Sequence, residues 1–335
     1  MVRIEFCLAW QDLDQGLPVL PMAMLFPGSF CQPPSFLDAL LVDLDPGQHR
    51  LLTVSRLLEQ QLAHPWRLDD LARQGCYSRH HFERVFADLT GRTPIDYLRR
   101  RRLLRAALRV RHERTPLLQI AHEIGFASDS VFSRNFKQTF GFAPRCWRAG
   151  AWLDFHLDIQ ERWRRLHDSD PDDVSDESLM ASLELNKPNV AVTAQVRYCA
   201  AQPVWLARSF GVWGTKAEAY WKMLAHTLPA TEQAPLWCAI TREDPGFVTG
   251  DECIYEWGVS AISQRPPGWL TDSLPSGYYL CLRYRGAGAP FRWLYSEWLE
   301  RQQRWITDAC RPHLNLFRDL GHALDGELRI PIRLR

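Results

Sequence analysis

The alternation of apolar and polar positions predicts two helices and a tight turn between residues 120 and 148. The first apolar series ends at Gly125, and a second series with helical spacing begins after Ser128 and stops at Gly141. Gly125 suits a turn that needs positive φ, and Ser128 is a natural N-cap for the second helix. The second helix carries an aromatic stripe on one side and short polar side chains with an arginine on the other. A helix of this kind fits the major groove of DNA.

The same arrangement is predicted once more, earlier in the chain. Amphipathic helices are expected from His49 to about residue 62 and from Leu68 to Gly75. Ser78 caps the helix that follows, and Cys76 stands in the turn, where a glycine-type residue is more usual. This part of the chain is therefore a second helix-turn-helix.

A long helix from Pro94 to His112 is predicted between these two units. Its 19 residues, at about 1.5 Å each, give a rod of roughly 28 Å. Successive major grooves on one side of B-DNA lie about 34 Å apart, so the rod can place two recognition helices about one turn of DNA apart. The run Arg99–Arg102 on this helix has two interpretations: a solvated face that pairs in part with Asp96 or Glu113, and a contact with phosphate.

Charge is segregated along the chain, although the overall balance is close to neutral. Residues 49–148 contain 19 Lys and Arg against 9 Asp and Glu, which gives +10, whereas the whole chain carries +1. This segregation is expected of a nucleic-acid-binding region joined to another domain. The nine cysteines are scattered and include no CxxC pair, which favours a reducing cytoplasm over a disulfide framework or a zinc site. No apolar run is long enough to span a membrane, and we expect neither a metal nor a cofactor.

From about residue 190 the pattern changes to strands separated by helices. Strands are expected at Val190–Ala194, Val204–Ala207, Pro235–Thr241, Glu252–Ala261, Gly277–Tyr284 and Glu327–Arg333, and helices at Ala217–Leu228 and Phe291–Ala309. The same order of strand, helix and paired strands occurs twice, which indicates an α+β fold with an internal duplication. Nine of the 14 Trp lie beyond Val190, and tryptophan both fills cores and stacks on flat or cationic ligands.

The chain is expected to divide into four parts. Residues 1–47 form a loosely ordered extension that lacks the features of a signal peptide. Residues 48–150 form the all-α domain with its two helix-turn-helix units. Residues 151–189 hold a helix, Trp152–His167, and an acidic linker, Asp168–Glu177. Residues 190–335 form the α+β domain.

Residues 50–148 resemble the DNA-binding domain of the AraC/XylS family. The matching positions are Pro94, Tyr97, Arg102, Leu103, Ala106, Ile120-Ala121, Gly125-Phe126, Ser128, Phe132-Ser133-Arg134, Phe136-Lys137, Phe140-Gly141, Pro144 and Arg148, with Trp147 where the family usually has tyrosine. The resemblance implies base-facing positions at His80, Glu83 and Arg84 in the first unit and at Asp129, Ser130, Ser133 and Arg134 in the second. Arginine can bridge O6 and N7 of guanine, and a carboxylate can accept from N4 of cytosine. For each position, an ordinary exposed side chain is the alternative.

The last 146 residues, 190–335, resemble the gyrase-inhibitor-like ligand-binding domain that some regulators of this family carry. The segments that carry this resemblance are Gly211-Val212-Trp213, Asp244-Pro245, Pro275–Tyr278 and Leu328–Pro331. The resemblance implies two strand-helix-strand-strand halves that form a curved sheet with a groove between the helices. The candidate ligand-binding residues are Trp213, Trp221, Glu256, Trp257, Trp293 and Asn315.

One departure from this second resemblance bears on chemistry. Related domains often place a glutamate in the segment that corresponds to Pro312–Phe317, where this chain has Asn315. An amide carries no charge and cannot act as a general base. Glu256 is the other source of a carboxylate, although we expect it to be exposed, because a buried glutamate among tryptophans would need a partner.

These features predict a cytoplasmic transcription regulator that is not an enzyme. It binds double-stranded DNA through both helix-turn-helix units, its C-terminal domain takes a small amphipathic or aromatic effector, and RNA polymerase is a further candidate partner. Two alternatives for the C-terminal domain stay open, a small-molecule hydrolase and a protein-interaction module. Asn315 argues against the hydrolase, as does the lack of GxSxG, P-loop, paired-carboxylate or metal-ligand spacing.

Overall fold

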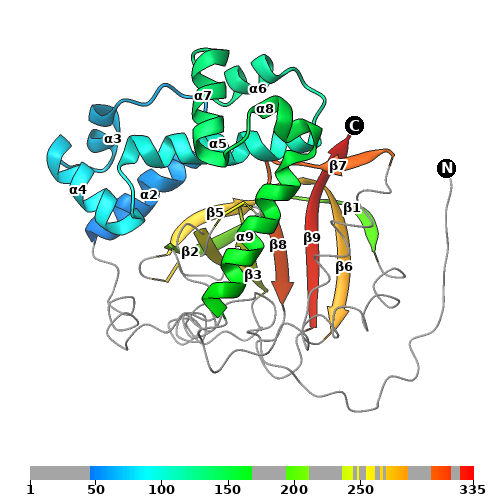
Figure 1. Ribbon diagram of the computed structural model, residues 1–335. Coiled ribbons are helices and arrows are strands. Elements are labelled where there is room, and N and C mark those ends of the chain that lie inside the picture. The colour runs from blue at the N-terminus through cyan, green and yellow to red at the C-terminus, as the bar shows by residue number, and fades with distance from the viewer. Residues whose placement is uncertain are drawn as a thin grey trace.

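The fold places a group of helices across one end of a curved antiparallel sheet (Figure 1). The computed structural model describes residues 46–167, 194–210, 236–243, 247–248, 254–260, 265–266, 269–285, 303–317 and 325–335. Its helices are α2 (Pro46–Gln60), α3 (Leu68–Gln74), α4 (Arg79–Thr90), α5 (Pro94–His112), α6 (Leu117–Glu123), α7 (Asp129–Phe140), α8 (Pro144–Cys146) and α9 (Trp152–His167). A turn of π-helix, η2 (Trp147–Ala151), joins α8 to α9.

The helices agree closely with the sequence pattern. The predicted bounds of α5 and α9 are confirmed, and Thr93 caps α5 by accepting a hydrogen bond from the Asp96 amide. The first helix starts earlier than predicted, because Pro46 and Gly47 already belong to α2. The rest of the predicted N-terminal extension and the acidic linker lie outside the described residues.

The sheet is antiparallel throughout its described pairings. Its strands are β1 (Gln195–Cys199), β2 (Gln202–Phe210), β3 (Trp237–Thr241), β4 (Ile254–Ser260), β5 (Leu270–Leu274), β6 (Gly277–Arg285), β7 (Trp305–Thr307), β8 (His313–Phe317) and β9 (Asp325–Leu334). They run in the order β1-β6-β9-β8-β3-β4-β2-β5, and β7 pairs with β9 beside this path.

Six of the strands follow one pattern twice. In the first set, β4 lies between β2 and β3, and in the second set, β9 lies between β6 and β8. In each set of three strands, the strand that comes last in the sequence lies in the middle and pairs with the other two. The sets meet where β3 pairs with β8, with Ala239 opposite Asn315. The helix predicted for 217–228 lies outside the described residues.

The C-terminal end of one predicted helix is wrong. The spacing of apolar residues favoured a helix up to Ala309, but Trp305–Thr307 form β7. There Trp305 lies opposite Leu334 and Thr307 opposite Ile332 of β9, so pairing with a distant strand overrides the local preference. The short strands β1, β5 and β8 were not predicted from the sequence, since the first expected strand, Val190–Ala194, ends before β1 begins.

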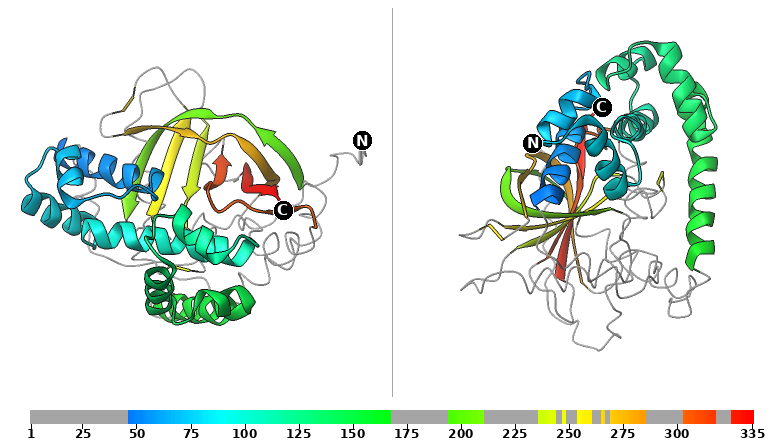
Figure 2. Two further views of the ribbon diagram at one scale, coloured as in Figure 1. Left: turned by 90° about the horizontal axis from the view of Figure 1, so that it is seen from above. Right: turned by 90° about the vertical axis from the view of Figure 1, so that its left-hand side faces the viewer.

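The helical and strand portions share one apolar core. Trp147 is fully buried, and its ring lies 5.2 Å from that of Phe247, between centroids. Phe155 of α9 also approaches Phe247, at 6.4 Å, and Tyr97 of α5 meets Phe210 of β2 edge to face at 6.3 Å. Figure 2 shows the two portions from above and from the side, with α9 running beside one face of the sheet. The helices are thus held against the sheet by aromatic contacts.

Candidate nucleic-acid interface

The first helix-turn-helix unit consists of α3 and α4. Leu71, Phe82 and Phe86 are fully buried between these helices. Cys76 forms the turn with a φ of 59°, and it is the one residue other than glycine with positive φ in the described part of the chain. Glycine adopts positive φ most easily, which is why a glycine-type residue is more usual at this position. Ser78 is the N-cap residue of α4, but its hydroxyl makes no capping hydrogen bond.

The second unit consists of α6 and α7. Gly125 turns the chain with a φ of 92°, and Ser128 caps α7 because its hydroxyl accepts from the Val131 amide at 3.3 Å. Phe132 and Phe136 of α7 are fully buried. Both predicted features of this turn are confirmed, so the second unit follows the sequence pattern more closely than the first.

The polar faces of α4 and α7 are open. His80, Arg84, Asp129, Ser130 and Arg134 are exposed, and Glu83 and Ser133 are partly buried. Arg84 approaches the ring of His81 at 3.2 Å, and Ser130 lies 3.1 Å from the Ser128 hydroxyl. The seven predicted DNA-binding residues thus lie on two helices whose other faces fill the core.

Helix α5 is the structural link between the two units. Its N-terminal part packs against α4, where the Phe86 and Tyr97 rings meet at 84° and 5.4 Å. Further along, Arg102 donates to the carbonyls of Leu62 at 2.7 Å and His64 at 2.8 Å. Near its end, the Ala107 carbonyl accepts from the Trp147 indole at 3.0 Å. This hydrogen bond ties the chain after α7 to α5.

Much of the positive charge on α5 is neutralised within the protein. Arg101 pairs with Glu243, and Arg99 pairs with Asp96 at 2.6 Å. The Arg109 guanidinium pairs with Glu113 at 3.0 Å and with Glu123 at 2.6 Å, and Arg111 stacks on Trp152 with 3.6 Å to the ring centroid. The expected pairs with Asp96 and Glu113 are thus found for Arg99 and Arg109. The expectation of a solvated face is wrong for Arg101, which is buried against Glu243.

A buried charge network joins the helices to the sheet. Arg208 of β2 is fully inaccessible, and it donates to Glu59 of α2, to Glu256 of β4 at 2.9 Å and to the Ser55 hydroxyl at 2.8 Å. The Tyr97 hydroxyl also donates to Glu59. Burial and the Glu59 charge raise the pKa of Tyr97 well above its usual value, so this hydroxyl keeps its proton and serves as a donor.

A second part of this network centres on Glu256 and Asp272. Arg242 donates to Glu256 at 2.5 Å and to Asp272 at 3.2 Å, and Arg56 pairs with Asp272 as well. Burial alone would raise the pKa of Glu256, but Arg242, Arg56 and Arg208 outweigh it and lower the value to about 2. Glu256 is therefore ionised in the interior, and it is held there by arginines from three elements.

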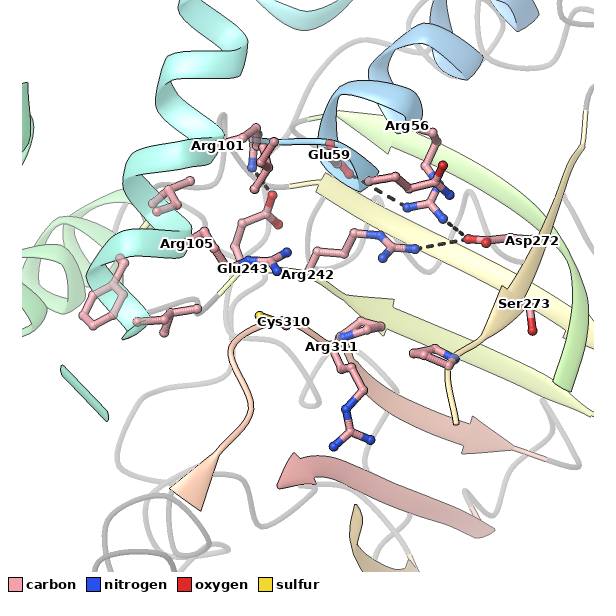
Figure 3. Close-up of a pocket in the computed structure, with 17 residues that line it drawn as sticks. Arg56, Glu59, Arg101, Arg105, Arg242, Glu243, Asp272, Ser273, Cys310 and Arg311 are labelled. Atoms are coloured by element: carbon pink, nitrogen blue, oxygen red, sulfur yellow. Dashed lines mark hydrogen bonds and ion pairs between the residues drawn. The ribbon is translucent and has the colours of Figure 1, made fainter. Parts of the chain in front are cut away.

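A pocket of about 460 Å³ lies beside this network (Figure 3). It is lined by α2, α5, the ends of β3 and β5, and the segment around Cys310. Its charged lining residues are Arg56, Glu59, Arg101, Arg105, Arg242, Glu243, Asp272 and Arg311. Sequence reasoning missed this set, because its members come from segments far apart in the chain and only the fold brings them together.

The candidate ligand-binding residues are not brought into one site. Trp213, Trp221 and Trp293 lie outside the described residues. Glu256 is fully buried, so the expectation of an exposed Glu256 is wrong, and three arginines provide the partner that burial requires. Trp257 is also fully buried, and successive strand residues point to opposite faces. Trp257 and Glu256 therefore cannot line the same pocket.

Trp257 and Asn315 do share one face of the sheet. Ala239 lies between them, opposite Trp257 on one side and opposite Asn315 on the other. Asn315 is 3% exposed, and its Oδ1 accepts from the Tyr284 hydroxyl at 2.7 Å. Its Nδ2 is a buried donor without a hydrogen-bond partner in the described part of the chain.

Two kinds of feature are absent from the residues that the structure describes. None of their helices is long and apolar enough to cross a membrane. No group of three or more His, Cys, Asp or Glu residues among them is arranged to hold a metal ion.

Comparison with known proteins gives a family for the helical portion. A family model described as a helix-turn-helix domain matches residues 71–150. Regulatory protein SoxS of Escherichia coli K12 is 34% identical over 91 residues, which are 27% of this chain and 85% of SoxS. Transcriptional regulator Rob of Salmonella typhimurium is 37% identical over 101 residues, which are 30% of this chain but only 35% of Rob.

A solved structure is also similar to part of the chain. The DNA-binding domain of AdpA, crystallised in complex with a target DNA, is 26% identical and covers 31% of this chain and 95% of that chain, with a TM-score of 0.30. The relationship rests on the sequence matches, since SoxS aligns over most of its own length. On that ground, the chain belongs to the AraC/XylS family of transcription regulators.

Proposed function

We propose that this protein regulates transcription by placing α4 and α7 in two successive major grooves of one DNA duplex. The observation that carries the proposal is that α5 connects the units to which these two helices belong. Each buries its aromatic face and leaves its polar face open, and the 19 residues of α5 lie between them. At about 1.5 Å per residue, α5 is roughly 28 Å long, close to the spacing of about 34 Å between grooves.

In this proposal the two helices have different chemistry. Helix α4 offers His80, Glu83 and Arg84, which suits guanine and cytosine edges. Helix α7 offers Arg134 with three short side chains, Asp129, Ser130 and Ser133. Because the two helices differ, we propose an asymmetric site that one chain reads without a symmetric partner.

The experiment is selection of bound sequences from a random DNA pool, followed by footprinting of the enriched site with the full chain. We expect two protected blocks separated by about one helical turn. A single protected block, or binding without sequence preference at about 150 mM salt, would reject the arrangement.

We further propose that the strand portion is a gyrase-inhibitor-like domain that binds a small molecule, as the second resemblance implies. The twofold repeat in strand order supports this, because each set contains one strand and one strand pair. The unsatisfied Nδ2 of Asn315, near Trp257 on one face, also supports it, since a buried donor costs free energy until it finds an acceptor. Titration of Trp fluorescence with aromatic cations and neutral aromatics tests this part, with Asn315→Leu as the matched variant.

The hydrolase alternative is disfavoured by the surroundings of Glu256. With a pKa of about 2, this carboxylate is a weak base, and all its ionic partners are buried arginines or Arg242 at the pocket edge. Efficient general bases have pKa values near the working pH. We therefore propose a regulator whose effector is bound and released unchanged, in the cytoplasm, with RNA polymerase as a candidate partner.

A further inference from the structure

The pocket beside the charge network has the dimensions of a binding site for a small molecule. Its volume is about 460 Å³, within the usual range of roughly 300–1,000 Å³ for ligand pockets. Residues of the helices and of the sheet line it together, including Leu104 and Arg105 from α5 and Asp272 from β5. A molecule in this pocket would touch both portions of the protein at once.

The arginines around the pocket are paired with one exception. Arg56 pairs with Asp272 and Arg101 with Glu243, Arg242 pairs with Glu256 at 2.5 Å, and Arg311 pairs with Asp308 at 2.8 Å. Arg105 forms no hydrogen bond or ion pair with any residue, as far as the described chain extends. It is partly buried, and it enters the pocket from α5 while Arg242 enters from the end of β3 (Figure 3). The pocket thus holds one positive charge that no carboxylate neutralises.

A second donor at the pocket lacks a partner. Arg56 is 7% exposed, and its buried Nη1 makes no hydrogen bond within the described residues. The closest approach of Nη1 in an ion pair is 4.0 Å to Glu59 Oε2, which is beyond hydrogen-bonding distance. Burial lowers the pKa of Arg56, as do Arg242 and Arg208, whereas Glu256 and Asp272 raise it. The unsatisfied Nη1 donor adds to the positive character of this side of the pocket.

Most of the uncharged lining is apolar. Its apolar members are Leu62, Leu104, Leu108, Phe247, Pro275 and Pro312, and Gln60, Ser273 and Cys310 complete the lining. An inorganic ion would leave these side chains in contact with water, whereas a molecule with an apolar body would cover them. We propose that this pocket binds a small organic anion, with a carboxylate or phosphate group at Arg105 and an apolar body against Leu104, Leu108 and Phe247.

The proposal differs from the effector site proposed for the strand portion. It takes an anion instead of a neutral or cationic aromatic molecule, and its residues are on the α2 and α5 side of the sheet. It also does not depend on DNA binding, so its test is made without DNA. Failure here would leave the proposed reading of DNA untouched.

The test uses three probes of equal chain length: sodium hexanoate, hexyl phosphate and hexanol. Binding to the full chain is measured by calorimetric titration and by the rise of the unfolding temperature. We expect saturable binding of at least one of the two anions and no saturable binding of hexanol. The tighter of the two anions identifies the head group as carboxylate or phosphate. If neither anion binds at up to about 10 mM, or if hexanol binds equally well, the proposal is overturned.

The decisive variant is Arg105→Gln, and the matched control is Arg283→Gln. Arg283 lies on β6, its side chain is 78% exposed, and it is not part of the pocket. We expect Arg105→Gln to weaken anion binding at least about 10-fold, which is about 1.4 kcal/mol, and Arg283→Gln to leave it unchanged. Arg105→Lys, which retains the charge, should recover part of the affinity.

The unliganded protein gives a second readout, which a purely structural role for Arg105 would not produce. Because the charge of Arg105 is unpaired, Arg105→Gln should unfold at the same temperature as the parent chain or higher when no anion is present. A lower unfolding temperature of Arg105→Gln without ligand, or anion binding equal to that of the parent chain, would show that Arg105 is not the anion's partner.

Discussion

Arg208 of β2 donates to Glu59 of α2, and this buried ion pair joins residues 149 positions apart in the chain. Both side chains are largely shielded from water, since the Arg208 side chain is fully inaccessible and the Glu59 side chain is 10% exposed. Together with the pair of Arg56 and Asp272, this pair connects the helices directly to the sheet.

Removing one partner of this pair should be strongly destabilising. Arg208→Met leaves Glu59 and Glu256 with one guanidinium fewer, so we expect a loss of about 3–5 kcal/mol in the free energy of unfolding. Urea denaturation measures it. Arg162→Met is the control, because its pair with Asp158 is 60% and 54% exposed and such pairs contribute about 0–1 kcal/mol. Equal effects of the two changes would contradict the role of the buried pair.

Stability should fall in acid through Glu256. Its folded-state pKa is about 2, below the ordinary 4.5, so the stabilisation is complete above about pH 4.5 and is lost as the pH falls towards about 2. The shift corresponds to a contribution on the order of 3 kcal/mol. Urea unfolding at a series of pH values should show this decline, and Glu256→Gln should be less stable at neutral pH with a shallower decline. An unchanged slope in Glu256→Gln would assign the acid sensitivity to other carboxylates.

Gly125 should tolerate a side chain less well than Gly141 does. Both have positive φ, 92° and 76°, but a Cβ at Gly125 would lie 2.8 Å from Arg102 Cζ and 2.9 Å from the Leu62 carbonyl oxygen. A Cβ at Gly141 would meet nothing within 4 Å. We expect Gly141→Ala to cost about 1 kcal/mol through backbone strain alone, and Gly125→Ala to cost roughly 2–3 kcal/mol. Thermal unfolding of both variants measures the difference, and equal costs would show that Arg102 moves aside freely.

Arg84→Ala and Arg134→Ala should act at different base positions. Each is expected to lose about 1–3 kcal/mol of binding free energy and to relax the preference at one position. The two positions should lie in opposite blocks of the selected site, since the residues are on α4 and α7. Fluorescence anisotropy with singly substituted duplexes measures this, and Arg283→Ala serves as the control. Equal weakening for every sequence, with a smaller salt dependence, would make either arginine a phosphate contact instead.

The helical portion could be predicted from the sequence because its signals are local. Pro94 and Thr93 begin α5, Gly125 and Ser128 define a turn, and Gly141 ends α7 through a left-handed conformation. Each of these depends on residues within four positions along the chain. The seven DNA-binding candidates follow from the same local register, and they stay predictions.

The junction between the portions could not be predicted in this way. Nothing near Glu59 indicates that Arg208 is its partner. In the sequence, Glu256 resembles an ordinary exposed charged residue, and only the packing of β2, β3 and α2 around it shows that it is buried. The same limit explains β7, where Leu334 decides the conformation of Trp305. The charge network and the pocket both depend on pairings between distant segments. The spacing of apolar residues along the chain does not predict such pairings.

The aromatic contact of Trp147 with Phe247 also bears on how the molecule melts. Because one apolar cluster includes Phe136 and Trp147 together with Trp237 and Phe317, neither portion completes its interior alone. Heating should therefore produce a single calorimetric endotherm, and amides of α5 and β3 should exchange their hydrogens through the same global opening. A partner that binds the sheet and shifts its strands would therefore also change the rigidity of α4 and α7.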